Sequence, residues 1–246
     1  MKEPVLVLGA TSAIARSTAR AFAEKGYSLY LAGRDNEELE RLASDFRLRY
    51  QIEVVCGVFD AEDYESHARF VEQVRSEAGG LKGVLLAFGY LGERKLAESD
   101  AKERVAVLAR NLIGAVSLLE PLAACLEQQR SGFVIGISSV AGDRGRQSNY
   151  IYGAAKGGFT IYLQGLRGRL FHAGVRVVTI KAGFVDTAMT YGMPGLFLVA
   201  SPEYVGKRIV QALERGSDVA YIPWFWRYIM LVLKLVPESL FKRLKL

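Results

Sequence analysis

Short apolar runs alternate along this chain with longer segments in which apolar residues recur with helical spacing. The first two runs, Val5 to Leu8 and Ser28 to Ala32, flank a helical segment from about Ser12 to Lys25 that ends at Gly26. Later apolar runs cover residues 52–59, 83–87, 132–138, 175–180 and 219–222, and helical segments separate them, including a long one over about 98–128. This order predicts an α/β fold, a doubly wound parallel sheet of six or seven strands.

No linker, charge block or repeat of fixed period divides the 246 residues, of which half are hydrophobic. We therefore predict a single domain over residues 1–222, followed by a helical tail over 223–246. Cys56 and Cys125 lie in apolar surroundings, which is typical of buried thiols in a reducing compartment. The sequence shows no secretory signal and no zinc-ligand spacing around His67 or His172, so we expect a cytoplasmic protein without a bound metal.

Most of the net charge of +6 lies in the C-terminal tail, which holds Arg227, Lys234, Lys242, Arg243 and Lys245 against the single acid Glu238. No nucleic-acid-binding motif accompanies these cations, so we expect no nucleic-acid partner. Residues 224–236 are apolar nearly all round, and as a helix of about 20 Å they are too short for the roughly 30 Å core of a bilayer. An amphipathic anchor in the membrane interface and a homo-oligomer interface both fit this pattern.

The loop after the first predicted strand, residues 9–15, has the sequence GATSAIA. In a βαβ unit such a loop presents backbone N–H groups and a helix N-terminus to an anionic ligand. Gly9 matches the first glycine of the dinucleotide-binding fingerprint, whereas Ala13 and Ala15 replace the later glycines. Thr11 and Ser12 can offer hydroxyl and amide groups to a phosphate. An ordinary turn capped by either residue is the alternative.

The end of the second strand bears on the choice of cofactor. Gly33 stands where an acid would accept the ribose 2′-hydroxyl of NAD(H), and Arg34 can pair with the 2′-phosphate of NADP(H). We therefore predict NADP(H), with NAD(H) as the less favoured cofactor; the alternative is that Arg34 is a solvated loop charge. Asp35 and Glu38 form a capping-box pattern for the helix that follows.

Two polar residues have both a structural and a functional interpretation. Asp60, after the third strand, can cap the next helix, contact an adenine amino group, or do both. Asn111 lies among apolar residues of the long helix, where an amide needs hydrogen-bond partners, so a core role and a catalytic role are both open. After the fourth strand, Gly89 and Gly92 suit a backbone that passes a flat ligand.

The stretch from Ser139 to Lys156 holds the strongest candidate chemistry. Tyr152 and Lys156 share one face of a helix, so the ammonium can lower the pKa of the phenol from its ordinary value of about 10. Gly153, in the run of small residues between them, can lie close to a ligand. A tyrosine and a lysine at this spacing also occur by chance, as a packed tyrosine followed by a surface lysine, so the surrounding motifs must decide.

Together these features resemble the classical short-chain dehydrogenase/reductase family over essentially the whole chain. The matching features are GATSAIA, Asp60, Asn111, Ser139 thirteen residues before Tyr152, the pair Tyr152 and Lys156, and AGFVDT at 182–187. The resemblance implies a Rossmann-like fold in which Tyr152 donates a proton to the substrate carbonyl. It also implies that Lys156 holds the cofactor ribose and lowers the Tyr152 pKa, that Ser139 binds the carbonyl, and that Asn111 positions a water.

The resemblance further implies a set of NADP(H) contacts: Gly9, Thr11, Ser12, Ala13, Ile14, Arg34, Asp60, Ala61, Ala87, Gly89, Tyr152, Lys156, Gly183, Phe184, Val185 and Thr187. The chain departs from the family pattern at Ala13 and Ala15, at Ala87 in place of an asparagine, and at Ala182 in place of a proline. These departures affect the fit of the cofactor, not the catalytic set. Family members often assemble through their C-terminal segments, so a homodimer or homotetramer is expected.

A narrower resemblance, carried by AFGYLGE, GDRGRQSNYIYG and the sequence from Tyr221 onward, is to the reductase subunits of decaprenylphosphoryl-ribose 2-epimerase systems. It implies a keto-sugar on a polyprenyl phosphate as substrate, a flavin-dependent oxidase as partner, and contact with the inner membrane surface. Arg144 and Arg146 are then candidates to clamp the phosphate, and Tyr191, in a glycine-punctuated lid, is a further candidate substrate contact. The alternatives are reduction of another carbonyl compound and an NADP(H)-binding protein without turnover.

Overall fold

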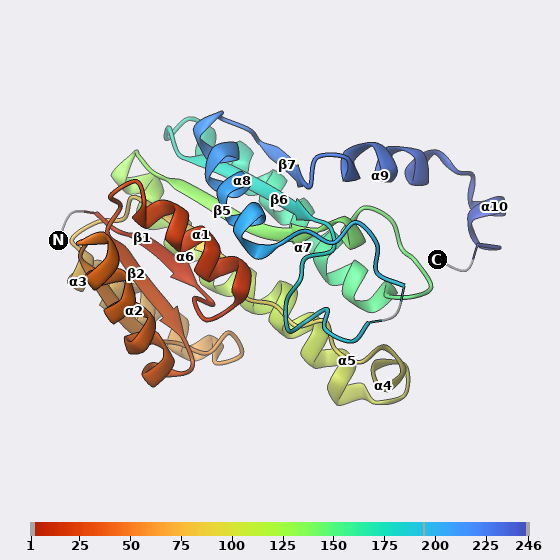
Figure 1. Cartoon of the computed structure of the whole chain (residues 1–246), viewed down its shortest axis with the longest axis horizontal. Helices are drawn as coiled ribbons and strands as arrows, with labels where there is room; N and C mark the ends of the chain where they lie inside the picture. The colour runs from red at the N-terminus through yellow and green to blue at the C-terminus, as the bar shows by residue number, and fades with distance from the viewer. Residues whose placement is uncertain (1–2, 194, 245–246) are drawn as a thin grey trace.

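Seven parallel strands form one sheet in the order β3-β2-β1-β4-β5-β6-β7. The computed structural model describes residues 3–193 and 195–244 (Figure 1). The strands are β1 (Val5–Leu8), β2 (Leu29–Gly33), β3 (Val54–Val58), β4 (Gly83–Leu86), β5 (Phe133–Ser139), β6 (Arg176–Ala182) and β7 (Val219–Ile222). The predicted doubly wound sheet is confirmed, with seven strands. Because the strand order reverses between β1 and β4, the carboxyl ends of these strands border a crevice, the usual ligand site of such sheets.

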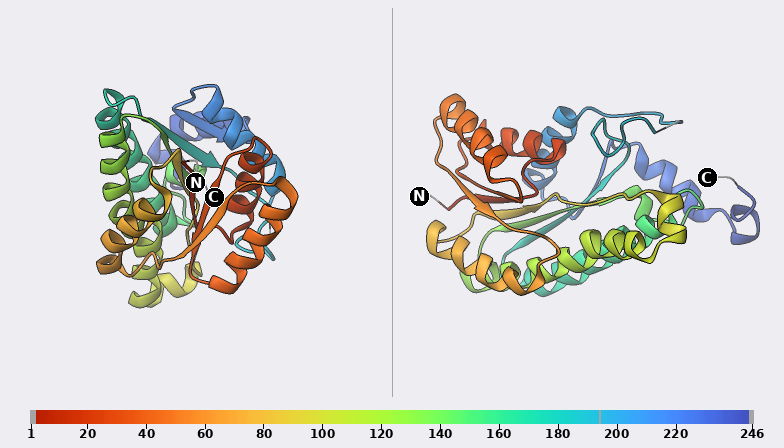
Figure 2. Two further views of the ribbon diagram at one scale, coloured as in Figure 1. Left: turned by 90° about the vertical axis from the view of Figure 1, so that its left-hand side faces the viewer. Right: turned by 90° about the horizontal axis from the view of Figure 1, so that it is seen from below.

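Helices cover both faces of the sheet, in three layers (Figure 2). The odd-numbered positions of β1 pack toward α1 (Ala13–Ala23), α2 (Asn36–Tyr50) and α8 (Pro202–Glu214). The even-numbered positions pack toward α3 (His67–Ala78), α6 (Gly114–Gln129) and α7 (Tyr150–Phe171). Both faces of a parallel sheet are therefore buried, which explains why the strands read as unbroken apolar runs.

The prediction of one long helix over 98–128 is wrong, because the helical segment begins earlier and is interrupted. The structure has a short helix α4 (Arg94–Ser99), then α5 (Ala101–Leu108), a π-helical turn η2 (Ala109–Ile113) and α6. Asp100 breaks the run because its backbone is extended and its carboxylate accepts a hydrogen bond from the Lys102 N–H, which caps α5. Residues 101–129 are apolar enough and long enough to cross a membrane. However, 44% of the most apolar 18-residue segment is buried, and α6 packs on the sheet as a core helix does.

Asp60 does not cap the helix that follows β3. That helix, α3, begins at His67, after a single 3-10 turn η1 (Tyr64–Ser66). The Asp60 carboxylate instead accepts a hydrogen bond from the Glu62 N–H. The capping half of the Asp60 prediction is therefore wrong, and the side chain stays at the carboxyl edge of the sheet.

The tail consists of α9 (Trp226–Leu235) and α10 (Glu238–Phe241), which extend beyond β7 at the right of Figure 1. Trp226 and Met230 are buried and form a small apolar cluster with Val140. Val140 belongs to the 3-10 turn η3 (Val140–Gly142) that follows β5. The tail thus packs directly against the loop that leads to Tyr152. Lys245, one of the predicted tail cations, lies outside the described residues.

Candidate active site

The loop after β5 and the first turns of α7 bring Ser139, Tyr152 and Lys156 to one cavity. Glycines make this close packing possible. A Cβ at Gly142 would lie 2.6 Å from the Gly157 N atom, and a Cβ at Gly153 would lie 2.8 Å from the Ala141 carbonyl oxygen. Gly153 therefore allows α7 to approach the η3 loop, so its small size serves helix–loop packing, and its predicted contact with a ligand stays a prediction.

Burial controls the charge states of the catalytic pair. Lys156 is 4% exposed, and its ammonium donates a hydrogen bond to the Ile137 carbonyl at 3.0 Å. Desolvation lowers the pKa of Lys156 to about 8 and raises the pKa of Tyr152 to about 12, while an interaction with the Ser139 side chain opposes part of the rise. The predicted lowering of the Tyr152 pKa by Lys156 is thus wrong for the protein alone, because the ammonium lies 5.9 Å from the phenol ring centre and points to a backbone carbonyl.

Asn111 lies behind the cavity, in the π-helical turn, and is 1% exposed. Its side-chain amide donates to the carbonyls of Tyr90 and Val107, and its carbonyl oxygen accepts from the Tyr90 N–H at 3.1 Å. Gly89 separates it from Lys156, since a Cβ at Gly89 would lie 2.8 Å from the Asn111 Oδ1 and 3.3 Å from the Lys156 Nζ. The structural role of Asn111 is therefore evident: it fixes the strand-end segment that lies beside the lysine.

A second cavity begins at the β1–α1 turn and shares Ala87, Phe88, Gly89 and Met189 with the first. Gly9 has a φ of +79°, and a Cβ there would lie 2.8 Å from the Phe88 N atom, so only glycine fits. Ser12 caps α1 through a hydrogen bond from the Ala15 N–H. The capping interpretation of the turn is confirmed, and it is compatible with the predicted phosphate contact because the N-terminus of the capped helix points into the cavity.

This second cavity combines hydrogen-bond donors, a cation and a carboxylate, as a site for a phosphorylated dinucleotide would. Its walls include Gly9, Thr11, Ser12, Arg34, Asp60 and Ala61. Arg34 is exposed and makes no ion pair within the described ranges, whereas the neighbouring Arg16 is paired with Glu38. The carboxylate of Asp35 caps α2 as predicted, by accepting from the Glu38 N–H at 3.0 Å. A free guanidinium next to a phosphate-binding turn fits an extra phosphate on the ribose.

A third cavity continues from Tyr152 toward α4 and the lid, residues 183–200. It shares Arg146, Asn149, Tyr152, Phe184, Met189 and Met193 with the catalytic cavity. The Arg146 Nε and the Asn149 Oδ1 are buried at this junction and have no hydrogen-bond partner among the described residues. Desolvation lowers the pKa of Arg146. Two unpartnered polar atoms beside the catalytic phenol indicate a polar ligand group at this point.

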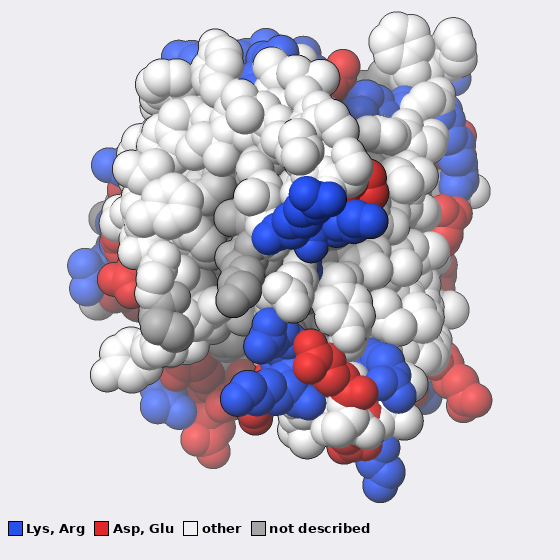
Figure 3. Space-filling view, turned by 90° about the vertical axis from the view of Figure 1, so that its right-hand side faces the viewer, with Lys and Arg blue, Asp and Glu red and all other residues white. Residues whose placement is uncertain are grey.

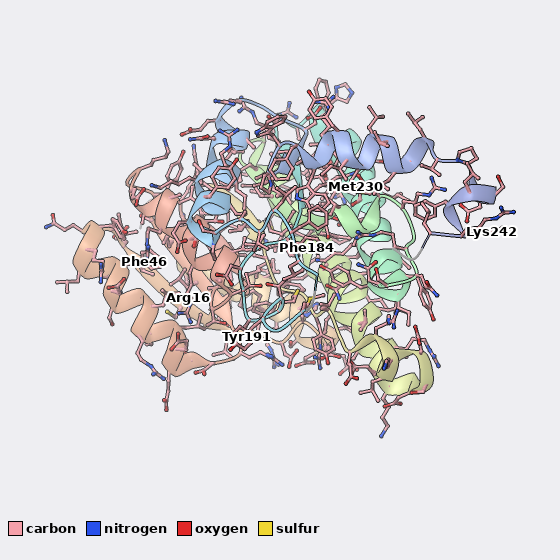
Figure 4. All side chains as sticks on the ribbon, turned by 45° about the vertical axis from the view of Figure 1, so that its right-hand side comes forward. Arg16, Phe46, Phe184, Tyr191, Met230 and Lys242 are labelled. Atoms are coloured by element: carbon pink, nitrogen blue, oxygen red, sulfur yellow. The ribbon has the colours of Figure 1, made fainter. Side chains whose placement is uncertain are left out.

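The lid is held to the tail by aromatic rings. Phe184 packs edge-to-face on Trp226 with ring centres 5.4 Å apart, and Phe197 lies 5.6 Å from the same indole. Gly183 is required below it, because any Cβ would overlap the Trp226 ring. Figure 4 shows Phe184 near the centre of the molecule and Tyr191 at the outer edge of the lid. The lid base is therefore fixed, and its outer turn is exposed.

The sequence pattern described as short chain dehydrogenase matches residues 3–193, which include the turn at Gly9 and the Ser139, Tyr152 and Lys156 constellation. The chain belongs to the short-chain dehydrogenase family. Its members are NAD(P)(H)-dependent oxidoreductases, and the chain is an oxidoreductase of this kind. The Rossmann-like fold and the enzyme class expected from the sequence are confirmed.

Relatives of this dehydrogenase span nearly its whole length. An uncharacterised oxidoreductase from Mycobacterium tuberculosis is 36% identical over 241 residues, 98% of this chain and 96% of its own. Another from Streptomyces coelicolor is 36% identical over 243 residues, 98% of this chain and 95% of its own. Both relatives are oxidoreductases, and neither name specifies a substrate.

Solved structures show the same fold. A short-chain dehydrogenase from Sphingobium yanoikuyae in complex with NADPH has a TM-score of 0.82 at 22% identity, covering 96% of this chain and 97% of its own. An alcohol dehydrogenase from Thermococcus sibiricus, complexed with 5-hydroxy-NADP, has a TM-score of 0.78 at 21% identity, covering 90% of this chain and 96% of its own. At these identities the similarity concerns the fold alone.

Most predicted site residues of this short-chain dehydrogenase meet in the connected cavities. Ile14, Gly183, Phe184, Val185 and Thr187 line the catalytic cavity. Four predicted residues are not in the walls of these cavities. Asn111 lies behind the catalytic cavity, Ala13 is the first residue of α1, and Tyr191 is 88% exposed on the lid. The fourth, Arg144, needs a separate account.

Arg144 does not join Arg146 in a clamp. Its guanidinium donates hydrogen bonds to the carbonyls of Leu233, Lys234 and Val236, pairs with Glu238, and lies 3.7 Å from the Phe241 ring centre. It thus caps the C-terminus of α9, so the prediction that it binds a substrate phosphate is corrected. The sequence reasoning missed Phe88, Asn149, Met189 and Met193 in the walls, because nothing in their local pattern distinguishes them from ordinary loop residues.

Proposed function

We propose that this protein reduces a ketone to a secondary alcohol by hydride transfer from NADPH, with Tyr152 as the proton donor. One observation carries the proposal: the Tyr152 phenol, the Ser139 hydroxyl and the Lys156 ammonium share a cavity that continues into the cleft at the β1–α1 turn. An oxidoreductase that binds a dinucleotide along this cleft would place its reactive end beside Tyr152.

NADP(H) is the proposed cofactor, and the bound nicotinamide would supply the hydride. Arg34 would hold the 2′-phosphate, the turn from Gly9 to Ser12 would hold the pyrophosphate, and Lys156 would bind the ribose hydroxyls. The complexes of the solved relatives with NADPH and 5-hydroxy-NADP support this preference. NAD(H) is the less favoured alternative, since Gly33 provides no carboxylate for a free 2′-hydroxyl.

The residues would divide the acid–base work in a simple way. With its pKa raised to about 12, Tyr152 keeps its proton at neutral pH, as a donor to a carbonyl oxygen must. Ser139 would donate a hydrogen bond to the same oxygen and stabilise the charge that develops there. At a pH below its pKa of about 8, Lys156 is positively charged and would offset the negative charge left on the phenol after the proton is donated. Asn111 would position a water that returns a proton to the relay.

The proposed substrate is a keto-sugar on a polyprenyl phosphate. Arg146 supports an anionic group near the ketone, because its half-buried guanidinium lies at the junction of the catalytic and outer cavities and has a buried nitrogen without a partner. The outer cavity supports an apolar tail, since Leu91, Ala97, Val107, Met193 and Leu196 line it. With this substrate, the proposed partner is a flavin-dependent oxidase that forms the ketone, and the proposed location is the cytoplasmic face of the membrane.

A different hydrophobic carbonyl compound is the second candidate, because the same apolar lining accepts one without a phosphate. The deciding experiment follows NADPH and NADH oxidation with a polyprenylphosphoryl 2-keto-riboside, its neutral lipid-linked counterpart and a panel of simple ketones. We expect NADPH oxidation with the phosphorylated compound and at least tenfold lower kcat/KM with the neutral one. Equal rates with both compounds would exclude the phosphate and favour the second candidate. Tight NADPH binding without oxidation of any ketone would favour a non-catalytic binder.

Arg146→Ala tests the phosphate contact directly. The variant should lose about tenfold in kcat/KM for the phosphorylated substrate and almost nothing for its neutral counterpart, because a charge-assisted hydrogen bond is removed from only one of them. Arg20→Ala is the matched control, since Arg20 is exposed on α1 and does not line the cavities. If Arg146→Ala affects both substrates alike, Arg146 shapes the loop and does not recognise phosphate.

A further inference from the structure

The outward face of α9 carries large apolar side chains that nothing in the described structure covers. Tyr228, Val232 and Leu235 follow one another at helical spacing and are 59%, 63% and 73% exposed. Leu231 beside them is 50% exposed, and Trp224, just before the helix, is 61% exposed. We name these five residues the apolar stripe. A helix that buries Trp226 and Met230 on one side and exposes this stripe on the other is apolar on two faces.

The stripe is held in place by the protein. Arg144 binds the carbonyls at the end of α9 and lies on Phe241, which is itself buried. The loop that carries Arg144 is anchored in turn, because the Asp143 carboxylate accepts hydrogen bonds from Lys181 and Tyr221. With both ends of α9 attached to the core, the tail cannot turn its outer face inward. The stripe therefore needs an external partner or remains against water.

A cationic cleft runs along the same helix. It lies between α8, β7 and α9, and its walls include Arg208, Arg215, Arg227 and Lys234 but no aspartate or glutamate. None of these four cations makes an ion pair within residues 3–193 and 195–244. Trp224 and Leu231 belong both to the stripe and to the walls of the cleft. An apolar surface and a row of unpaired cations thus meet along one edge of α9.

The end of the molecule that presents the tail has a broad uncharged surface. Figure 3 looks onto this end and shows a patch of Lys and Arg near its centre, and Asp and Glu lie beside Lys and Arg along the lower and right-hand margins. Lys242 and Arg243, just after α10, are also exposed and unpaired in the part of the chain that the structure describes. The one tail acid, Glu238, is already paired with Arg144. The free charge of the tail is therefore positive throughout.

We propose that the apolar stripe and the cationic cleft bind the surface of a membrane that contains anionic phospholipids. The stripe would enter the boundary of the acyl chains while the cations contact lipid phosphates, with α9 parallel to the surface. A helix of ten residues is about 15 Å long, so it lies on a bilayer and does not cross one. A second copy of the chain fits less well, because a symmetric pairing through the stripe would bring the unpaired cations of both copies together.

This inference goes beyond the reaction and does not rest on it. It does place the lid beside the membrane, because Phe197 of the lid packs on Trp226 of α9. The exposed lid residues Phe197, Leu198 and Val199 would then lie at the same surface. A substrate carried in the bilayer could enter the outer cavity along this edge.

The test is flotation of the full-length protein with vesicles of phosphatidylcholine alone or with one-third phosphatidylglycerol. We expect wild type to bind the anionic vesicles at low salt and to dissociate at high salt. Val232→Gln with Leu235→Gln should abolish binding to them. Arg227→Ala with Lys234→Ala should weaken the partition coefficient on anionic vesicles by about tenfold or more, since each cation near the surface adds to the attraction.

The matched control is Leu48→Gln with Phe171→Gln, which also replaces two large apolar residues with glutamine, at positions that are 81% and 71% exposed on other elements. It should bind like wild type. Unchanged circular dichroism melting of every variant shows that binding, not folding, is altered. Equal binding of the stripe variant and wild type would overturn the proposal. So would an absence of vesicle binding together with a wild-type dimer that Val232→Gln with Leu235→Gln splits in sedimentation equilibrium, because a second copy then covers the stripe.

Discussion

The half of the cleft proposed to bind the cofactor and the half proposed to bind the substrate are built from different parts of the chain; we call them the cofactor half and the substrate half. The cofactor half uses strand ends and the turns that follow them, so Gly33 is the last residue of its strand, Gly9 lies one residue beyond a strand and Asp60 lies two residues beyond one. The substrate half gathers α4, the η3 loop, the lid and the tail, which are distant in the sequence. Backbone geometry determines the first half, and side-chain packing determines the second.

This difference separates chemistry from specificity. The sheet topology and the packing of α7 bring the turn at Gly9 and the residues Ser139 and Lys156 to one edge, where the dinucleotide is proposed to bind. Arg146 and the apolar outer cavity depend on how Arg144 and Trp226 hold the loop and the lid. Substitutions in the first half should therefore lower the reaction rate with every substrate, whereas substitutions in the second half should lower it for some substrates and not for others.

The largest effect is expected from Tyr152→Phe. Loss of the phenol removes the proposed proton donor, so turnover should fall a hundredfold or more while NADPH still binds. Steady-state rates together with fluorescence titration of NADPH measure both quantities. Tyr204→Phe, at a partly exposed tyrosine of α8, is the control. Near-normal turnover of Tyr152→Phe would remove Tyr152 from the mechanism.

Lys156→Met should separate activity from stability. Turnover should fall about thirtyfold or more, because the charge opposite the phenol is lost. Because the pKa of Lys156 is lowered from 10.5 to about 8, burial of the ammonium costs wild type about 3 kcal/mol of stability at neutral pH. The variant avoids this cost but loses the hydrogen bond to Ile137, which contributes about 1 kcal/mol. The variant without cofactor should therefore unfold in urea with about 2 kcal/mol more stability.

The stability difference between wild type and Lys156→Met should depend on pH. Between pH 8 and 10 the unfolded chain binds more protons at Lys156 than the folded chain does, so wild type gains stability as pH rises. The advantage of Lys156→Met should shrink over the same range. A stability difference that stays constant with pH would show that Lys156 is not desolvated in the folded protein.

The sequence predicted the backbone around the proposed cofactor half well because its signals are local. A strand followed by Gly9 and a capped helix has few structural solutions, and the edge of a parallel sheet then brings the remaining strand ends together. The spacing of Ser139, Tyr152 and Lys156 was equally informative, since one loop and one helix connect them. Seven strands could be read from seven apolar runs for the same reason.

The substrate half could not be read in this way. Arg144 and Arg146 look alike in the sequence, yet one caps α9, which lies far along the chain, and the other reaches the cavity. The pKa of Tyr152 depends on burial, which helical spacing does not reveal. The break at Asp100 reflects a side-chain cap within a mostly charged and polar stretch, residues 94–104, just before the apolar part of the predicted helix. Each miss concerns a contact between distant segments or a competition between local ones.

Arg34→Ala tests the cofactor half at its most exposed contact. Loss of the guanidinium should raise the KM for NADPH about tenfold and leave the KM for NADH nearly unchanged, because only NADPH has the 2′-phosphate. Arg41→Ala, at another exposed arginine of the same region, is the control. Equal changes for both cofactors would mean that Arg34 does not read the phosphate.

The smallest effect on catalysis is expected from Arg144→Ala. The substitution removes the cap of α9 and the contact with Phe241, so amide hydrogen exchange in α9 and α10 should accelerate. Because Arg146 lies two residues away, kcat/KM for the lipid-linked substrate should fall a few-fold, and kcat/KM for a small ketone should not. Arg144→Lys should restore only part of both effects, since an ammonium cannot bind several carbonyls and stack on the ring at once. If Arg144→Ala lowers both rates equally, the tail supports the whole site, and the two halves of the cleft are not separable in the way their construction suggests.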